Sequence, residues 1–478
     1  MNSASAPTTV GVPWWRLLNR YHWFVLVVAS AAWCFDCLDQ RLFSLARIPA
    51  LSDLMGKPAS DPAVQAMGKE VTAFFLVGWG IGGLIFGALG DRFGRARMLT
   101  ITVLIYSFAT GLSFFSKFYW DFALFRFITG LGVGGVFGLA VSLIAETVPD
   151  GARAQSLGLL QVLSTFGNVS AGFFKMWIDS LEKGGTISAG HGWRWMFLVG
   201  ALPAFLVIFI RKYLKEPERW LKLKAEGHLA TGGMFASYRG LLAERRWRKH
   251  LLVGAVIAST GVVGLWAIGE YAVDLQRNIF HTHYAQEFVA QGKITAEQIA
   301  TPDAKKLTKP LVDSAIAWAY LANMCGAALG MWLFTRVANL FGRRLAFLIG
   351  FSSALVITFM VYWRMNSPHD AYWMMPLMGA AQLAVFAGFA IYLPELFPSR
   401  LRSTGTSFCY NAGRFAAAAG SLFSAGLARW AFGSYGSPLT ERYSAMTMCV
   451  IFLAGILILP FAPETKDKPL PEDIEPAK

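Results

Sequence analysis

Three ionisable residues stand at similar depths inside long apolar stretches, where charge is costly and a partner or a function is expected. Asp36 and Asp39 are three residues apart, so both fall on one face of a helix. At ~1.5 Å per residue they lie about 20 and 25 Å into their stretch, and Arg126 lies at about the same height on another. A carboxylate pair beside an arginine can bind and release a proton, so we expect these residues to form a proton site. A static salt bridge is the alternative.

Arg414 is a fourth buried charge, about 17 Å into its own apolar stretch and close to the midplane. The planar guanidinium fork matches a carboxylate in two-point contact, so we expect Arg414 to bind an anion. Pairing with Glu395 or with a helix carbonyl is the alternative, but Glu395 lies roughly 20 Å away in height. Other polar or aromatic residues in the stretches are candidates to line the same site, although each also suits ordinary helix packing. They are Asn411, Gln161, Trp266, Gln382 and Tyr410.

The elements that position these residues are predicted to be membrane-spanning helices. Of the 478 residues, 55% are hydrophobic and only 15% are charged, and the apolar residues come in blocks of the length that crosses a bilayer. The sequence therefore predicts an all-α membrane protein with twelve transmembrane helices in two six-helix bundles. The predicted spans are 22–46, 71–90, 97–116, 121–145, 154–178, 194–212, 250–273, 312–335, 343–363, 372–393, 403–427 and 442–462.

Charge placement indicates the topology. Lys and Arg are more frequent in the segments on one side of the predicted spans, which places both termini in the cytoplasm. The polar segment 213–249 divides the spans six and six. We therefore expect an N-terminal bundle (1–212), a cytoplasmic linker (213–249), a C-terminal bundle (250–462) and an extended cytoplasmic tail (463–478), with 274–311 as an outer loop. The net charge of +14 fits this pattern and not a nucleic-acid partner.

An internal repeat relates the two halves. Glu146, Pro149 and Arg153 recur with identical spacing as Glu395, Pro398 and Arg402, and Phe93-Gly94-Arg95 recurs as Phe341-Gly342-Arg343. The charged members fall at one end of the spans, where breaking and making ion pairs would bias the chain between two states. Charge that only fixes topology is the alternative. The residues of this predicted gate cluster are Asp91, Arg95, Glu146, Arg153, Glu395 and Arg402.

Several motifs resemble those of the major facilitator superfamily. The loop Gly87-Ala-Leu-Gly-Asp91-Arg-Phe-Gly-Arg95-Ala-Arg97 is similar to its signature between spans 2 and 3, and Arg126 opens a fourth-span pattern. Phe35-Asp36-Cys37-Leu38-Asp39 resembles the paired-aspartate motif of aromatic-acid and metabolite proton symporters, with Cys37 in place of glycine. The Arg402 to Arg414 spacing resembles organic-anion carriers and sialic-acid permeases. Lys215-Glu216-Pro217 and Pro463-Glu464-Thr465 resemble the sugar-porter-like branch.

This resemblance implies a secondary transporter, not an enzyme. We expect proton-coupled symport of a small organic anion, a carboxylate, aromatic acid or acidic sugar, by a functional monomer in the cell inner membrane. A sugar or polyol transporter, a proton-driven metabolite or drug exporter, and a transporter-like receptor are the alternatives. The expected partners are the substrate, the proton and the lipid bilayer, with no cofactor and no metal site. The five cysteines fall in apolar blocks, where they suit packing.

Overall fold

The computed structural model describes residues 12–59, 61–188, 190–229, 235–436 and 438–471, and every regular element in these ranges is helical. The α-helices are α1 (Arg20–Met55), α2 (Pro62–Phe93), α3 (Arg95–Leu112), α4 (Tyr119–Thr147), α5 (Asp150–Lys183), α6 (Gly192–Gly200), α7 (Leu206–Tyr213), α8 (Glu218–Ala225), α9 (Ala236–Ala243), α10 (Arg245–Val263), α11 (Gly269–Ala290), α12 (Pro302–Phe341), α13 (Arg343–Arg364), α14 (Pro368–Glu395), α15 (Arg402–Gly426), α16 (Leu439–Met448) and α17 (Ile451–Ile458). Three short helical segments recur below: the π-helix η4 (Gly264–Ile268) and the 3-10 helices η6 (Ser399–Leu401) and η9 (Leu459–Phe461).

Eleven helical segments of the described chain are long and apolar enough to cross a membrane. The predicted eleventh span, α15, is not among them, because it carries Arg402, Arg414 and many small polar residues. Its 25 residues are nevertheless long enough to span, at ~1.5 Å per residue. Large apolar side chains face outward, such as Phe108, Trp120 and Leu422, which are 69%, 70% and 78% exposed. The all-α membrane fold is confirmed.

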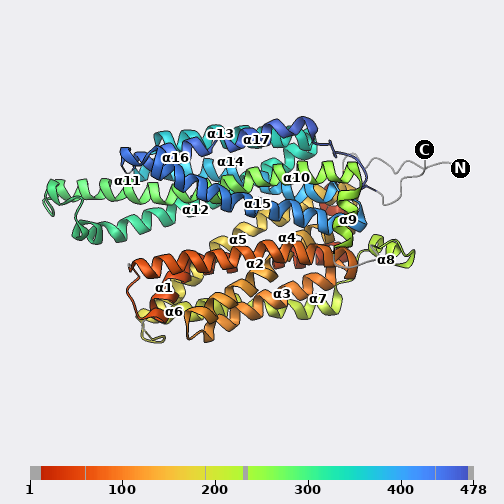
Figure 1. Ribbon diagram of the computed structural model, residues 1–478, viewed down its shortest axis with the longest axis horizontal. Coiled ribbons are helices and arrows are strands. Elements are labelled where there is room, and N and C mark those ends of the chain that lie inside the picture. Colours follow the sequence, from red (N-terminus) through yellow and green to blue (C-terminus); the bar gives the residue numbers. More distant parts are fainter. Residues whose placement is uncertain (1–11, 60, 189, 230–234, 437, 472–478) are drawn as a thin grey trace.

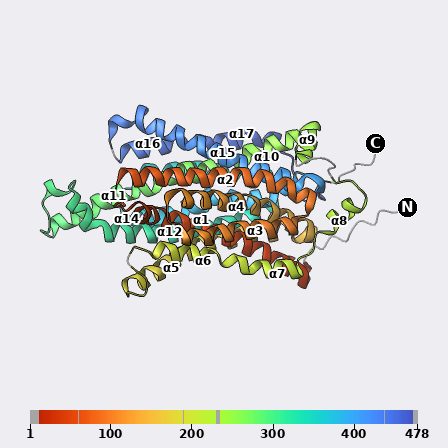
Figure 2. The same ribbon diagram turned by 60° about the horizontal axis from the view of Figure 1, so that its bottom comes forward.

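The long helices run along one common axis in two neighbouring groups (Figures 1 and 2). We call α1 to α7 the N-terminal group and α10 to α17 the C-terminal group. In Figure 1, α1, α2, α3, α6 and α7 lie below, α10 to α17 lie above, and α4 and α5 lie between them. Helices α8 and α9 lie together at the right-hand end, which we call the linker end. The opposite end, which we call the outer end, carries the connections between α11 and α12.

The predicted outer loop and the predicted tail differ from the structure. The outer loop expected at 274–311 is mostly helical, because α11 continues to Ala290 and α12 begins at Pro302. This hairpin projects past the other helices at the outer end (Figure 1). The linker contains α8 and α9. The tail, expected to be extended, packs against the protein at residues 463–471, where Leu470 is 2% exposed. Residues 472–478 lie outside the described residues.

Glycines on α2 bring the two groups of helices into close contact. Gly80, Gly83, Gly87 and Gly90 are three or four residues apart, so they share one face of the helix, and this face meets α15. A Cβ at Gly87 would lie only 2.5 Å from the Cβ of Ser407. Small residues permit this approach of backbones, as at other membrane helix interfaces.

Two repeat-related carboxylates cap helices at the linker end. Glu216 accepts from the backbone N–H groups of Ala96 and Arg97 at the start of α3, over distances of 3.1 and 2.9 Å. Glu464 accepts from Arg343 and Arg344 at the start of α13, at 2.9 and 3.0 Å. These motifs therefore satisfy helix N-termini.

A glycine with positive φ precedes each of these capped helices. Gly94 and Gly342 have φ values of 108° and 102°, which L side chains rarely adopt. Each also leaves room for a carboxylate, since a Cβ at Gly342 would lie 2.7 Å from Glu464 Oε2. The Phe-Gly-Arg repeat is thus explained by backbone geometry and by helix capping together.

We predict that Glu464→Gln destabilises the protein at neutral pH by about 1 kcal/mol, since it removes an anion from a helix N-terminus. Burial acts to raise the pKa of Glu464, but backbone N–H donors, those of Arg343 and Arg344 first, hold the pKa below its ordinary 4.5. The stabilisation is therefore present above pH 4.5 and is lost as the pH falls below it. Thermal unfolding in detergent should show the difference shrinking in acid. The exposed Glu297→Gln is the control, and an equal loss there would contradict the capping role.

Candidate functional site

Arg414 lies on α15 between the two groups of helices and is 7% exposed. Its guanidinium carbon is 3.6 Å from the ring centre of Trp79 on α2 and 5.5 Å from that of Trp266 in η4. Its Nη2 donates to Tyr410 Oη at 3.2 Å. Its Nε and Nη1 have no hydrogen-bond partner among the described residues. The rings offset the charge of the guanidinium but supply no acceptor for these two donors, so part of the fork is buried without a hydrogen-bond partner among the described residues.

An aromatic wall continues from this arginine into the N-terminal group of helices. Tyr410 stacks on Phe137 of α4 with the ring centres 3.9 Å apart. The ring centre of Trp33 on α1 lies 5.1 Å from that of Phe137 and 6.1 Å from that of Tyr410. The Trp33 indole N–H donates to Gln161 Oε1 of α5. The surroundings of Arg414 are thus largely apolar and flat, with polar groups at few points.

The three residues of the predicted proton site do not form one cluster. Asp39 Oδ1 lies 3.8 Å from Arg126 Nη1 and accepts from Thr110 Oγ1 at 2.8 Å. Arg126 also donates to Ser113 Oγ at 2.8 Å, and its guanidinium carbon lies 4.5 Å from the Phe197 ring centre. This pair is fully buried within the N-terminal group of helices. Its geometry suits a salt bridge that fixes α1 against α4.

Asp36 is separate from that pair. It is 0% exposed, and neither of its carboxylate oxygens accepts a hydrogen bond among the described residues. Its charge interacts through space with the charges of Asp39 and Arg414. An ionised carboxylate in so dry a place needs a compensating charge, and a proton removes that need. Asp36 is therefore a buried carboxyl group on α1 without a recorded ion pair among the described residues.

Two other candidate residues are used in helix packing. Asn411 donates to Ser407 O at 2.8 Å and to Gly134 O at 3.5 Å. Gln382 donates to Thr358 Oγ1 of α13 at 3.0 Å. Both are buried, and their recorded partners are not part of the aromatic wall. Of the predicted lining residues, the structure thus places Trp266 and Tyr410 against Arg414 and Gln161 against the aromatic wall.

The two groups of helices also touch on the outer side of this site. The guanidinium carbon of Arg41 on α1 lies 4.2 Å from the ring centre of Tyr320 on α12. Arg41 is five residues beyond Asp36 toward the outer end of α1. The site therefore lies between this contact and the polar contacts of the linker end.

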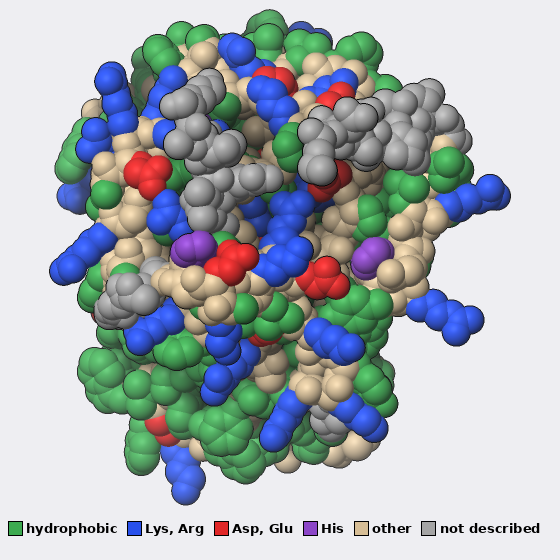
Figure 3. Space-filling view, turned by 90° about the vertical axis from the view of Figure 1, so that its right-hand side faces the viewer, with side chains coloured by type: hydrophobic (Ala, Val, Ile, Leu, Met, Phe, Trp, Pro, Cys, Tyr) green, Lys and Arg blue, Asp and Glu red, His purple; other side chains and the backbone are tan. Residues whose placement is uncertain are grey.

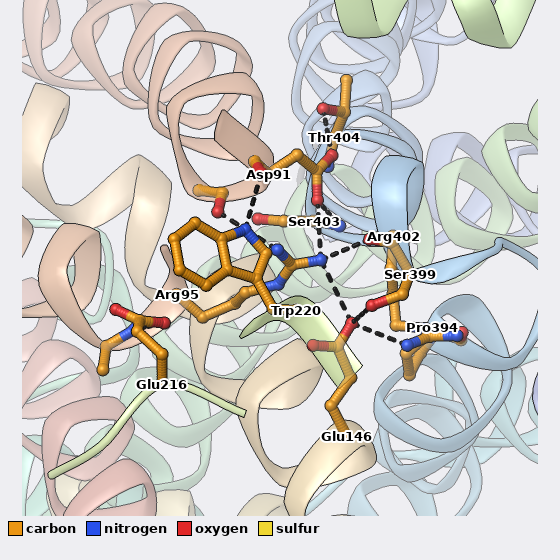
Figure 4. Close-up of polar contacts among 12 residues, drawn as sticks. Asp91, Arg95, Glu146, Glu216, Trp220, Pro394, Ser399, Arg402, Ser403 and Thr404 are labelled. Atoms are coloured by element: carbon orange, nitrogen blue, oxygen red, sulfur yellow. Dashed lines mark hydrogen bonds and ion pairs between the residues drawn. The ribbon is translucent and has the colours of Figure 1, made fainter. Parts of the chain in front are cut away.

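At the linker end, Asp91 caps the N-terminus of α15 across the boundary between the groups (Figure 4). Its two oxygens accept from the backbone N–H groups of Ser403 and Thr404 at 3.0 and 2.9 Å, and Thr404 Oγ1 donates to it at 2.6 Å. Its backbone oxygen accepts from the Trp220 indole at 2.8 Å. A carboxylate at a helix N-terminus is favoured by the unsatisfied N–H groups and by the helix dipole.

Glu146 is the second connection across this boundary (Figure 4). Its Oε1 lies 3.1 Å from Arg95 Nη2 and 2.6 Å from Arg402 Nη1, and it accepts from Ser399 Oγ at 2.8 Å. Arg95 also lies 3.1 Å from Asp91 and donates to Ser399 O. One buried acid thus joins arginines from both groups of helices.

The remaining two gate-cluster residues have different main partners. Glu395 forms a two-point contact with Arg343, at 2.8 and 3.1 Å, and accepts from Thr465 Oγ1 at 2.6 Å. Arg153 pairs with Asp150 of its own helix. The expected group of six is therefore divided among three sets of contacts. The ion pairs Arg95–Glu146 and Arg343–Glu395 are related by the repeat, but Glu146 also contacts Arg402 of the other group. The repeat counterpart of Asp91 is Asn339, whose Nδ2 has no partner among the described residues.

Trp79, Trp33, Phe137 and Arg343 were not among the predicted site residues. Aromatic residues in a hydrophobic span give no signal by type alone. For Trp79 a signal existed, because it lies between Gly78 and Gly80 on the glycine-rich face of α2. For Arg343 the Phe-Gly-Arg repeat pointed to a counterpart of Arg95.

The matches to known proteins cover most of the chain. Residues 59–249 and 311–475 match the family described as "Sugar (and other) transporter". The chain belongs to this family. A putative metabolite transport protein of Haemophilus influenzae is 27% identical, over 83% of this chain and 87% of that protein. The cis,cis-muconate transport protein of Acinetobacter baylyi is 27% identical, over 72% of this chain and 75% of that protein.

A solved structure shows the same fold. The proton:xylose symporter XylE of the major facilitator superfamily, from Escherichia coli, superposes with a TM-score of 0.67 at 20% identity, over 94% of this chain and 98% of XylE. The predicted two-bundle fold is thus confirmed. This family member is a multi-pass membrane transporter of small molecules and not an enzyme.

We predict that Asp91→Asn loosens the linker end, because the α15 N-terminus loses a charged acceptor. Exchange of the Ser403 and Thr404 amide hydrogens should become faster, by about tenfold, as expected for weakened hydrogen bonds to a charged group. Hydrogen exchange followed by mass spectrometry measures this. Asp370→Asn removes a carboxylate from a helix N-terminus, that of α14, and is the control. Unchanged exchange in Asp91→Asn would show that the cap does not hold this end closed.

Proposed function

We propose that this transporter carries a small organic anion together with a proton, by alternating access to the site around Arg414. One observation supports this above all: Arg414 lies buried between the two groups of helices with two donors unsatisfied. A membrane protein keeps such a group where it serves a ligand or a pathway. A carboxylate would supply both the missing charge and the missing acceptors.

The surroundings favour a flat or largely apolar anion. Trp79, Trp266 and Tyr410 surround the guanidinium, and Phe137 and Trp33 extend the wall. Rings of this kind stack on planar groups and leave few acceptors for the hydroxyls of a neutral sugar. The Acinetobacter baylyi relative, whose name specifies cis,cis-muconate, is consistent with such a cargo.

Proton coupling follows from competition for Arg414. When Asp36 is ionised, it interacts with Arg414 through space and opposes a second anion there. When Asp36 is protonated, the charge of Arg414 is free for the substrate. Proton and anion would then bind together, as symport requires. In this proposal Asp39 and Arg126 support the site by holding α1 in place.

Alternating access would move residues 1–212 against residues 250–462 as two bundles joined by the linker 213–249. The described part of the tail 463–478, residues 463–471, packs at the linker end. The gate cluster would close the linker end, and Arg41 with Tyr320 would close the outer end. We place the linker end in the cytoplasm and the protein, as a monomer, in the cell inner membrane. The distribution of Lys and Arg supports this orientation.

We predict that Arg414→Gln abolishes uptake of carboxylates into proteoliposomes and their stabilisation of the purified protein against heat. A loss of at least about 100-fold in affinity is expected for removal of a buried two-point ionic contact, at about 3 kcal/mol. The control is Arg429→Gln, which removes an exposed arginine beyond α15. Benzoate, cis,cis-muconate and xylose form the test panel.

The panel also separates the alternatives. If Arg414→Gln binds a carboxylate as tightly as the unmodified protein, the anion site is elsewhere. Stabilisation by xylose but by neither acid would favour a neutral sugar. Accumulation driven opposite to the proton flow, in vesicles of known orientation, would favour an exporter.

We predict that Asp36→Asn and Asp39→Asn fail differently. Asp36→Asn should still exchange labelled substrate across the membrane but no longer accumulate it along a pH gradient, because the titrating group is gone. Asp39→Asn should lower thermal stability as well, because Arg126 loses its charged partner inside the protein. Unchanged proton-driven accumulation in Asp36→Asn would remove that residue from the coupling mechanism.

A further inference from the structure

A cavity of about 380 Å³ lies at the linker end, away from the transport site. It opens between the first turns of α10 and the end of the last span, η9. Arg245, Arg248 and Lys249 line one part of it, and apolar residues that include Leu252 and Phe461 line the rest. Figure 3 shows that Lys and Arg side chains predominate over acidic ones on this face of the molecule.

The three cations gather on one side of α10. Their spacing of three and four residues places them on neighbouring turns of a single helix face, where like charges repel. The structure records no ion pair for Arg245, Arg248 or Lys249 in the described ranges. The adjacent Glu244 does not neutralise them, because its Oε1 lies 2.7 Å from Arg400 Nη2. An anion in the cavity would relieve this repulsion.

The backbone adds to the same attraction. Helix α10 has 19 residues and begins at Arg245, and no side chain in the described part of the protein caps its N-terminus. The first backbone N–H groups of a helix lack partners within it, and the positive end of the helix dipole favours an anion there. Side chains and backbone therefore point to one ligand chemistry, a phosphate-like group.

The position of the cavity indicates where this phosphate comes from. Leu252 is 62% exposed and Phe461 is 59% exposed, at the point where α10 and the last span enter the apolar belt. A head group among the three cations would leave its acyl chains against these two side chains. With the linker end in the cytoplasm, the cavity faces the leaflet whose surface carries anionic lipids.

We infer that this cavity is a binding site for the head group of an anionic phospholipid, held by Arg245, Arg248, Lys249 and the N-terminus of α10. The apolar rim of Leu252 and Phe461 receives the acyl chains. A soluble phosphate compound shares the head-group chemistry but gains nothing from the rim. The site is independent of the cargo and of proton coupling.

The test uses the full chain in detergent micelles, titrated with dioleoylphosphatidylglycerol or dioleoylphosphatidylcholine and followed by native mass spectrometry. The variant Arg245→Gln, Arg248→Gln, Lys249→Gln should bind phosphatidylglycerol at least about tenfold more weakly, given the attraction of each lost cation. The control Lys222→Gln, Lys224→Gln, Arg239→Gln removes the same charge from exposed positions on α8 and α9, and should bind as the unmodified protein does.

The outcomes separate a lipid site from its rivals. The inference is supported if the α10 variant alone loses phosphatidylglycerol binding and if phosphatidylcholine binds weakly to every variant. Equal losses in both variants would mean that overall charge alone attracts the lipid, which overturns it. Displacement of phosphatidylglycerol by millimolar inorganic phosphate would assign the cavity to a free anion and also overturn it. All six positions are exposed, so the substitutions leave the packed interior unchanged.

Discussion

Buried charge must be compensated inside this protein, and the way it is compensated joins the two groups of helices. Surrounded by hydrocarbon, an ionised side chain is stable only beside an opposite charge or hydrogen-bond partners. Asp91 and Glu146 find these partners across the boundary, on η6 and α15. Arg414 finds rings from both groups and one hydroxyl, and two of its donors remain open. The contacts proposed to hold one end closed and the group proposed to bind cargo thus obey a single constraint.

Helix α15 connects these two places. Its first turn receives Asp91, its middle packs on the glycines of α2 through Ser407 and Asn411, and Arg414 follows one turn later. A displacement of α15 that releases Asp91 therefore also shifts Arg414 against Trp79. This gives the proposed cycle a physical basis, because occupancy of the site and closure of the linker end act on the same helix.

The repeat in the sequence is matched by some of the polar contacts but not by all of them, since Arg95–Glu146 recurs as Arg343–Glu395. Glu216 and Glu464 cap α3 and α13 in the same way, so the two halves share their helix-capping chemistry. Asp91 and its repeat counterpart Asn339 differ. Asp91 binds a helix N-terminus in the other group, whereas Asn339 Nδ2 has no partner among the described residues. A carboxylate on both sides would add a second charged contact and hold the linker end closed more firmly.

The sequence by itself determined the fold class, the spans and the repeat, because bilayer thickness fixes helix length and burial fixes composition. It also singled out Asp36, Asp39, Arg126 and Arg414, since charge in an apolar block is visible without a structure. Only the tertiary structure separated Asp36 from the Asp39–Arg126 pair and brought Trp79 to Arg414. Those relations depend on how helices rotate and pack about one another, which residue type and spacing do not specify. The α11–α12 hairpin was hidden for a related reason: polar helices outside the bilayer lack the apolar periodicity that marks a span.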